Sequence, residues 1–93
     1  MIQSFADKDT KRLWNRERVR SIDSRIHSVA LRKLRQLGYA QTLDELRIPP
    51  GNRLEALKGD RRGHFSIRIN DQWRICFRWS AAGPEEVEIV DYH

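Results

Sequence analysis

The sequence ends in EIVDYH, where three neighbouring side chains can accept, donate or orient a proton. Asp91 and His93 are candidates for proton transfer, and Tyr92 is a candidate to stack on a base or orient it. Earlier in the chain, Lys58 and Arg74 are candidates to bind phosphate oxygens. These residue types suit metal-free cleavage of RNA, in which the 2′-hydroxyl attacks the adjacent phosphate while the enzyme moves protons and stabilises negative charge.

Each of these residues also has an ordinary structural explanation. Lys58 begins a Lys-Gly-Asp stretch that is typical of a turn with solvated charges, and Arg74 is suited to pairing with a glutamate across a sheet. Asp91 has the strand parity of the apolar face, so a regular strand would point it away from Tyr92. The terminal side chains can share a site only if the end of the strand departs from regular geometry.

Several other kinds of site lack their sequence patterns. Gly59 and Gly63 flank charged residues without the lysine and hydroxyl of a phosphate-binding loop. The single cysteine and the three histidines do not have zinc-ligand spacing, and no group of carboxylates suggests a two-metal nuclease. We therefore expect chemistry without a metal or another cofactor.

The composition is that of a small, basic protein. A length of 93 residues predicts one domain over residues 1–93. Arginine predominates among the 18 basic residues, the net charge is +5, and the pI is near 10.0. The planar guanidinium suits phosphate, and such a pI is typical of a nucleic-acid-binding domain. A solvated polar face or an acidic protein partner is the alternative explanation.

The sequence also predicts a location. It lacks an apolar run of the roughly 20 residues that a membrane helix needs, and its first residues do not have the pattern of a signal peptide. Cys76 is the single cysteine, which fits a reducing compartment. We expect a cytoplasmic protein without membrane association.

Helices are expected in the first half of the chain and strands in the second. A short strand is predicted over Ile2–Phe5, and a helix over Lys8–Arg18 is predicted to begin after Asp7. A stronger apolar stripe predicts a helix over Ile22–Leu37, with Gly38 just beyond its end. Alternating patterns predict strands over 53–57, 64–70, 72–79 and 86–90, with a hairpin turn at 70–71. The residues thus predict helices followed by a mainly antiparallel sheet, an α+β class.

The strand alternation separates two faces of this sheet. One face is apolar and should be covered by the helices. The other carries His64, Arg68, Arg74, Arg78 and Tyr92. On the two central strands this second face has arginines and no carboxylate, which favours an open platform for single-stranded RNA. An ordinary polar sheet face is the alternative, and the glutamates of the last strand could pair with some of the arginines.

Two segments of the sequence, RLEALKGDRRGHFSIRINDQWRICFRW and VEIVDYH, resemble HigB-type toxins of the RelE/ParE superfamily. The resemblance covers essentially the whole chain. It implies the toxin of a type II toxin–antitoxin system, a ribosome-dependent and metal-independent endoribonuclease that cuts translated mRNA at the A site. It implies a RelE-like fold with two N-terminal helices packed on one face of a mostly antiparallel, twisted sheet. The implied partners are a HigA-like helix-turn-helix antitoxin, the ribosome and mRNA.

The resemblance also assigns roles to residues. It implies catalytic positions at Lys58 of LKGD and at Asp91, Tyr92 and His93 of VDYH. Glu55 stands where many relatives have a histidine, three residues before the lysine. Either Glu55 is the base, or proton transfer depends on Asp91 and His93, or catalysis is weak; we favour the second alternative. The expected RNA-binding residues are Arg61, Arg62, Arg68, Arg74 and Arg78.

Two other functions remain open at this point. A ParE-like toxin would inhibit DNA gyrase without cutting RNA, and a basic binding module would only hold RNA or an acidic partner. Lys58 and the DYH terminus favour the ribonuclease, because a protein that only binds has no need of proton-transfer groups.

Overall fold

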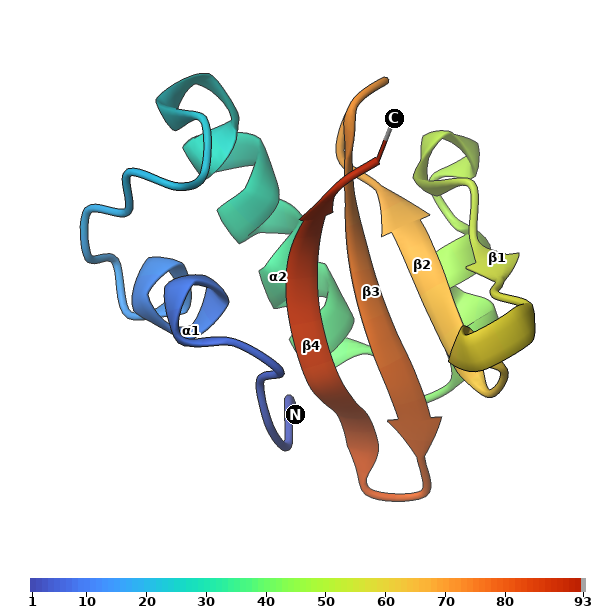
Figure 1. Cartoon of the computed structure of the whole chain (residues 1–93). Helices are drawn as coiled ribbons and strands as arrows, with labels where there is room; N and C mark the ends of the chain where they lie inside the picture. The colour runs from blue at the N-terminus through green and yellow to red at the C-terminus, as the bar shows by residue number, and fades with distance from the viewer. Residues whose placement is uncertain (93) are drawn as a thin grey trace.

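The computed structural model describes residues 1–92, and in this part of the chain two α-helices lie on one side of a four-stranded antiparallel sheet (Figure 1). The elements are α1 (Lys8–Trp14), α2 (His27–Tyr39), β1 (Glu55–Ala56), β2 (His64–Arg68), β3 (Trp73–Ser80) and β4 (Gly83–Asp91). The strands are ordered β1-β2-β3-β4, so each strand pairs with its neighbour in sequence. The architecture confirms the predicted α+β class, with N-terminal helices on one face of the sheet.

Helix α1 begins where the sequence predicts and ends earlier. The Asp7 side chain caps it by accepting a hydrogen bond from the Thr10 amide at 3.4 Å. The predicted helix continued to Arg18, but α1 ends at Trp14, and Arg16 has a left-handed φ of 64°. No apolar stripe continues beyond Trp14 to hold a further turn against the core.

Helix α2 is displaced toward the C-terminus from its predicted range. A 3-10 turn over Ser24–Ile26 precedes it, and the helix continues to Tyr39. The prediction that Gly38 follows the helix end was therefore wrong. A Cβ at Gly38 would lie 3.7 Å from Ile2 and 3.8 Å from Trp14. Ile2 and Trp14 thus pack on the helix at Gly38, at distances that would also leave room for a methyl group.

The connector between α2 and the sheet is fixed by a buried hydrogen-bond network. Thr42 and Glu45 form a capping box at the start of the 3-10 turn Leu43–Arg47. Asn52 is completely buried; its amide donates to the Leu46 carbonyl at 3.1 Å, and its oxygen accepts a hydrogen bond from Lys33 of α2. Burial lowers the pKa of Lys33. These contacts hold the connector in place directly before the sheet.

The strands follow the predicted pattern with changed ends. β1 has only two residues, while β4 extends at both ends of its predicted range and contains a bulge opposite the Cys76–Arg78 stretch of β3. The predicted strand Ile2–Phe5 was wrong as a regular strand. Phe5 makes a single parallel bridge to Val87 of β4, and the segment is held by hydrogen bonds such as that from the Gln3 amide to the Pro84 carbonyl at 2.8 Å.

The hydrophobic core lies between the helices and the apolar face of the sheet, as predicted. Its centre includes Leu34, Leu37, Ile67, Ile75 and Phe77, all with no exposed surface. None of the helices within residues 1–92 is long and apolar enough to cross a membrane.

Candidate active site

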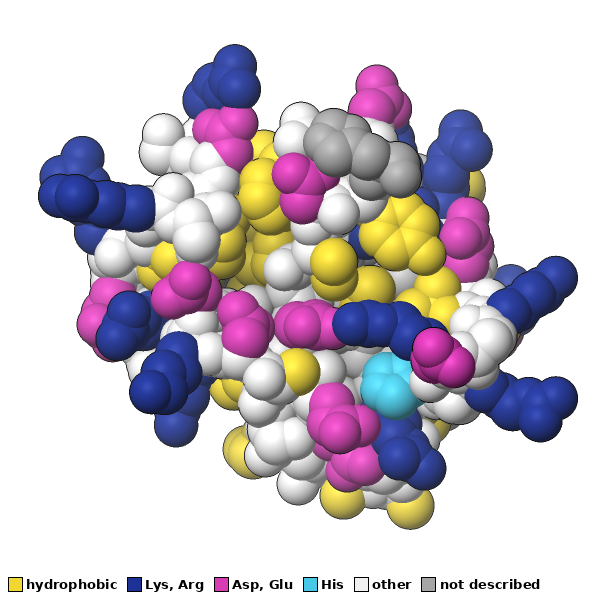
Figure 2. Space-filling view, viewed as in Figure 1, with side chains coloured by type: hydrophobic (Ala, Val, Ile, Leu, Met, Phe, Trp, Pro, Cys, Tyr) yellow, Lys and Arg dark blue, Asp and Glu magenta, His cyan; other side chains and the backbone are white. Residues whose placement is uncertain are grey.

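The sheet face opposite the helices is more closed than the sequence suggests. Ser66 and Cys76 have no exposed surface, and Arg74 is only 8% exposed. Basic and acidic side chains are interspersed across this face (Figure 2). The expected open, arginine-lined platform is therefore wrong for the centre of the face, which is buried, and carboxylates pair with Arg68 and Arg74. Arg78 is exposed and forms no ion pair with the described residues.

Arg74 is at the centre of this face and has a partner on every side. Its Nε donates to the Ser66 hydroxyl at 2.8 Å, and its Nη2 donates to the Arg53 carbonyl oxygen at 2.7 Å. The same guanidinium lies 3.9 Å from the Glu55 carboxylate and 6.0 Å from the centre of the Tyr92 ring. These contacts fix the plane of the guanidinium and gather three predicted site residues, Glu55, Arg74 and Tyr92, in one place.

The strand register explains why these side chains meet. Glu55 of β1 lies opposite Ser66 of β2, and Ser66 lies opposite Cys76 of β3. Arg74, two residues before Cys76, points to the same face and reaches diagonally to Ser66. The left-handed backbone at Arg53 (φ 45°) lies just before β1, and its carbonyl oxygen accepts the second hydrogen bond of Arg74.

A second charged pair connects the β1–β2 loop to β4. The guanidinium of Arg61 forms an ion pair with Glu88, and this hydrogen bond raises the pKa of Arg61. Glu88 lies opposite Cys76, whose pKa is raised because the thiol is buried. The Arg61 amide also donates to the Lys58 carbonyl oxygen at 3.3 Å. The loop that carries Lys58 is thus held over the sheet by Arg61.

Lys58 itself is exposed at the start of the 3-10 turn Gly59–Arg61. Its ammonium group makes no hydrogen bond or ion pair with the described residues. Gly59 follows with a φ of 66°, a conformation that glycine adopts without strain. The turn therefore presents an unpaired ammonium group within the loop that Arg61 anchors.

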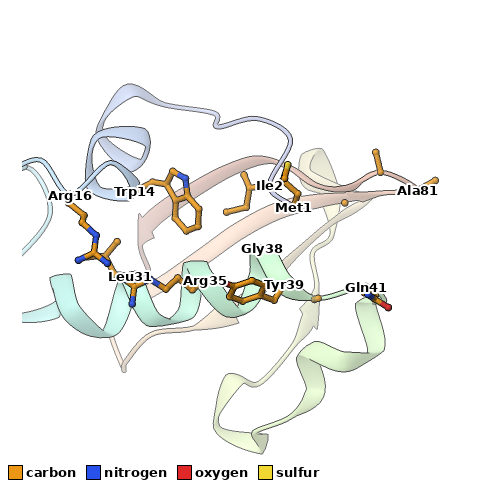
Figure 3. A pocket seen from close by; sticks show the side chains of 13 residues that line it. Met1, Ile2, Trp14, Arg16, Leu31, Arg35, Gly38, Tyr39, Gln41 and Ala81 are labelled. Atoms are coloured by element: carbon orange, nitrogen blue, oxygen red, sulfur yellow. The ribbon is translucent and has the colours of Figure 1, made fainter.

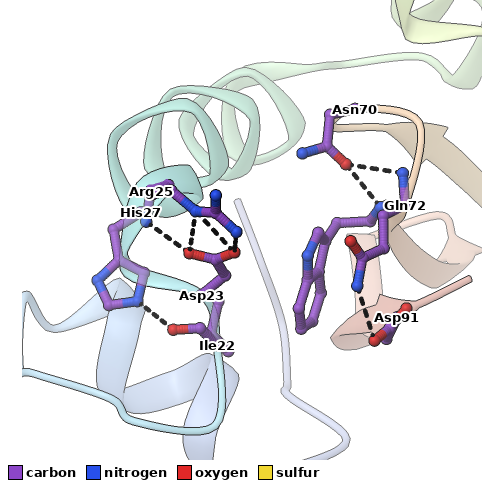
Figure 4. Close-up of polar contacts among 8 residues, drawn as sticks. Ile22, Asp23, Arg25, His27, Asn70, Gln72 and Asp91 are labelled. Atoms are coloured by element: carbon purple, nitrogen blue, oxygen red, sulfur yellow. Dashed lines mark hydrogen bonds and ion pairs between the residues drawn. The ribbon is translucent and has the colours of Figure 1, made fainter.

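Asp91 lies on the other side of the strand. It faces Trp73 in the register, and the Gln72 side chain donates a hydrogen bond to its carboxylate at 3.1 Å (Figure 4). The Tyr92 amide donates to the Gln72 carbonyl at 2.5 Å, which keeps this end of β4 paired. The regular strand thus separates Asp91 from Arg74 and Tyr92, as its parity predicts. His93 lies outside the described residues.

The predicted RNA-binding arginines fall into two groups. Arg61 pairs with Glu88, Arg68 pairs with Asp71 at the hairpin turn, and Arg74 is buried among its partners. Arg62 and Arg78 are exposed and make no ion pair with other described residues. Arg62 and Arg78 are therefore the members of the predicted set whose charge is both exposed and unpaired among the described residues.

Three contributors to the site were not identified from the sequence. Strand alternation places Ser66 on the correct face, but a serine between apolar residues gives no signal of a hydrogen bond to an arginine. The Arg53 carbonyl belongs to a residue with a left-handed backbone. Residue propensities do not predict this conformation at a residue other than glycine. The sequence suggests Glu88 only as a partner of the sheet arginines, whereas Glu88 pairs with Arg61 from a loop.

Residues 1–92 contain no group of three or more His, Cys, Asp or Glu side chains placed to hold a metal ion. The geometry gathers an oriented guanidinium, a carboxylate and an aromatic ring. The exposed Lys58 ammonium is on the loop that follows β1. Such a set can neutralise phosphate charge, accept a proton and stack on a base.

Comparisons with known proteins agree with this fold. The chain is 22% identical to a YoeB/ParE toxin from Agrobacterium tumefaciens of known structure, with a TM-score of 0.54 over 99% of this chain and 96% of the other, a likeness of fold. It is 44% identical over 80 residues to Toxin HigB-1 of Vibrio cholerae, covering 85% of this chain and 84% of the relative. It is 29% identical over the whole of both chains to Endoribonuclease HigB of Proteus vulgaris. Residues 3–93 match the family model described as the RelE-like toxin of the type II toxin–antitoxin system HigB, and the chain belongs to this HigB-like toxin family.

Proposed function

We propose that this toxin is a ribosome-dependent endoribonuclease that cuts translated mRNA at the A site without a metal ion. The observation that carries the proposal is the fixed guanidinium of Arg74, which lies beneath Tyr92 and beside Glu55. The full-length likeness to a protein named Endoribonuclease HigB supports the same activity. A type II toxin also implies a cognate antitoxin as its protein partner.

Each group has a role in this proposal. Glu55 accepts the proton of the 2′-hydroxyl as the 2′-oxygen bonds to phosphorus, and the bond from phosphorus to the 5′-oxygen breaks. His93 gives a proton to the departing 5′-oxygen. Arg74 and Lys58 stabilise the extra negative charge on the phosphate, and Tyr92 stacks on a base.

We propose a different base from the one that the sequence favours. The sequence favours Asp91 with His93, but the Asp91 carboxylate accepts a hydrogen bond from Gln72 on the other side of the strand. Glu55 is the carboxylate that contacts Arg74 among residues 1–92. Because the base must lie close to the group that binds the reacting phosphate, we assign the base role to Glu55 and not to Asp91.

The test uses toxin purified free of antitoxin, programmed ribosomes and a defined mRNA, with cuts mapped by primer extension. Wild type should cut within A-site codons. Lys58→Ala and Glu55→Gln should each lower the single-turnover rate by about 100-fold or more, because each removes a charge-stabilising or proton-transfer group. His93→Ala should also abolish cleavage, while Asp91→Asn serves as the matched carboxylate control and should retain it.

Two outcomes would contradict the proposal. Intact mRNA with the wild-type toxin rules out the nuclease, and inhibition of DNA supercoiling by gyrase in the same preparation would favour a ParE-like function. Loss of cleavage in Asp91→Asn with normal cleavage in Glu55→Gln would return the base role to Asp91.

A further inference from the structure

A groove of about 810 Å³ lies on the helical side of the molecule, away from the candidate active site. Its walls come from the N-terminal residues, the end of α1, the second half of α2 and the β3–β4 turn (Figure 3). The β3–β4 turn and the last residues of β4 lie at opposite ends of the sheet (Figure 1). The groove is thus separate from the surface that carries Arg74 and Tyr92.

The groove has an exposed apolar wall. Met1 is 83% exposed and Tyr39 is 84% exposed, and both line it. Ile2 and the half-buried Trp14 point into the space toward α2 (Figure 3). Large apolar side chains left in water on a folded monomer commonly mark a surface that another protein covers.

The charges of the groove have one sign. Arg16 and Arg35 line it, and none of the 13 lining residues carries a carboxylate. Neither arginine forms an ion pair with another described residue. Arg16 is held in its left-handed conformation directly after α1, where its amide donates to the Leu13 carbonyl at 2.9 Å. These positive charges therefore lack a negative counterpart within the described chain, unlike Arg61, Arg68 and Arg74 on the opposite face.

We propose that this groove binds an acidic, amphipathic segment of the cognate antitoxin. Apolar side chains of the segment pack against Trp14 and Tyr39, and its carboxylates pair with Arg16 and Arg35. An RNA backbone would satisfy the two arginines but would leave the apolar wall uncovered, so a protein segment fits the surface better. This inference rests on membership of the toxin family and not on the proposed ribonuclease activity.

The test measures antitoxin affinity for matched pairs of toxin variants. The toxin and antitoxin are expressed together from their native gene pair, separated under denaturing conditions, refolded and titrated by calorimetry. Tyr39→Ser is matched with Ile48→Ser, because Ile48 is 72% exposed but lies outside the groove. Arg35→Glu is matched with Arg32→Glu, because Arg32 is an exposed arginine of the same helix that does not line the groove.

The groove variants should each weaken antitoxin binding by about tenfold or more, whereas the matched variants should change it by less than about twofold. Binding of wild type should weaken as salt rises, and this dependence should be smaller for Arg35→Glu. Circular dichroism melting of all four variants checks that they fold. All four should still cut mRNA if wild type does, since none alters the candidate active site.

Equal losses in the groove variants and their controls, or no loss in either, would overturn the inference. Weaker ribosome binding with unchanged antitoxin binding in Arg35→Glu would assign the groove to RNA instead. If wild type fails to cut mRNA but the groove variants still lose the antitoxin, the proposed function fails and this inference stands.

Discussion

Arg74 has a structural place in the sheet, and the proposed function also gives it a chemical role. Its guanidinium is oriented by Ser66 and by the Arg53 carbonyl, and it still lies beneath the Tyr92 ring. A planar fork can make both hydrogen bonds at once, whereas an ammonium group on a flexible chain cannot hold the same geometry. The contacts of Arg74 therefore depend on the planar shape of its guanidinium as well as on its charge.

We predict that Arg74→Lys lowers both stability and cleavage. Losing one buried hydrogen bond and leaving its acceptor unpaired should reduce the free energy of unfolding by about 1–3 kcal/mol. Single-turnover cleavage on programmed ribosomes should fall by about tenfold or more, because the charge no longer has a fixed position. Urea unfolding and primer extension measure the two effects.

Arg78→Lys is the control for this change, because Arg78 lies on the same strand and is exposed. It should leave the free energy of unfolding within about 0.5 kcal/mol of wild type. A fully active and fully stable Arg74→Lys variant would show that the bidentate geometry has no role.

At the scale of elements, the N-terminal segment depends on a glycine of β4. Gly83 has a φ of 133°, and a Cβ there would lie 2.5 Å from the Met1 carbonyl oxygen. The Gln3 side chain donates to the carbonyl oxygens of both Met1 and Ala82, at 2.8 Å and 3.0 Å. The first residues can therefore lie against the β3–β4 turn only because position 83 has no side chain.

Gly83→Ala is expected to reduce the free energy of unfolding by about 1–3 kcal/mol, because it combines a strained backbone with a clash against the N-terminal segment. Gly51→Ala is the control, since a Cβ at Gly51 meets nothing within 4 Å and its φ is not positive. It should change the free energy by less than about 1 kcal/mol. Urea denaturation followed by tryptophan fluorescence measures both, and equal values would disprove the role of the close approach.

The sequence predicts element types and strand faces better than contacts between elements. Alternation correctly assigns Ile75 and Phe77 to the core, and it correctly turns Asp91 away from Arg74. Gly38 misleads because a glycine inside the last turn of a helix and a glycine just after its end look the same in a sequence. The buried state of Arg74 depends on a loop carbonyl and a neighbouring strand, which local patterns do not encode.

At the scale of the whole molecule, which has a net charge of +5, some basic side chains form ion pairs and others do not. On the sheet face, Arg61 and Arg68 are already paired with Glu88 and Asp71. Arg62, in the loop between β1 and β2, and Arg78, on β3, are exposed. Neither forms an ion pair with the described residues. Because only charges that neutralise phosphates release counterions, the paired arginines should add little to the salt dependence of RNA binding.

The salt dependence of binding to a single-stranded RNA tests this division of charge. For single strands, the slope of log K against log salt changes by about 0.7 for each phosphate neutralised. Arg78→Gln should therefore reduce the slope by about 0.7. The double variant Arg68→Gln with Asp71→Asn removes a neutral pair, so it should leave both slope and net charge unchanged. Fluorescence anisotropy at several salt concentrations measures the slopes. A smaller slope in the double variant would mean that Arg68 leaves Asp71 and binds a phosphate when RNA binds. The ion pair would then break on binding and Arg68 would contact the RNA.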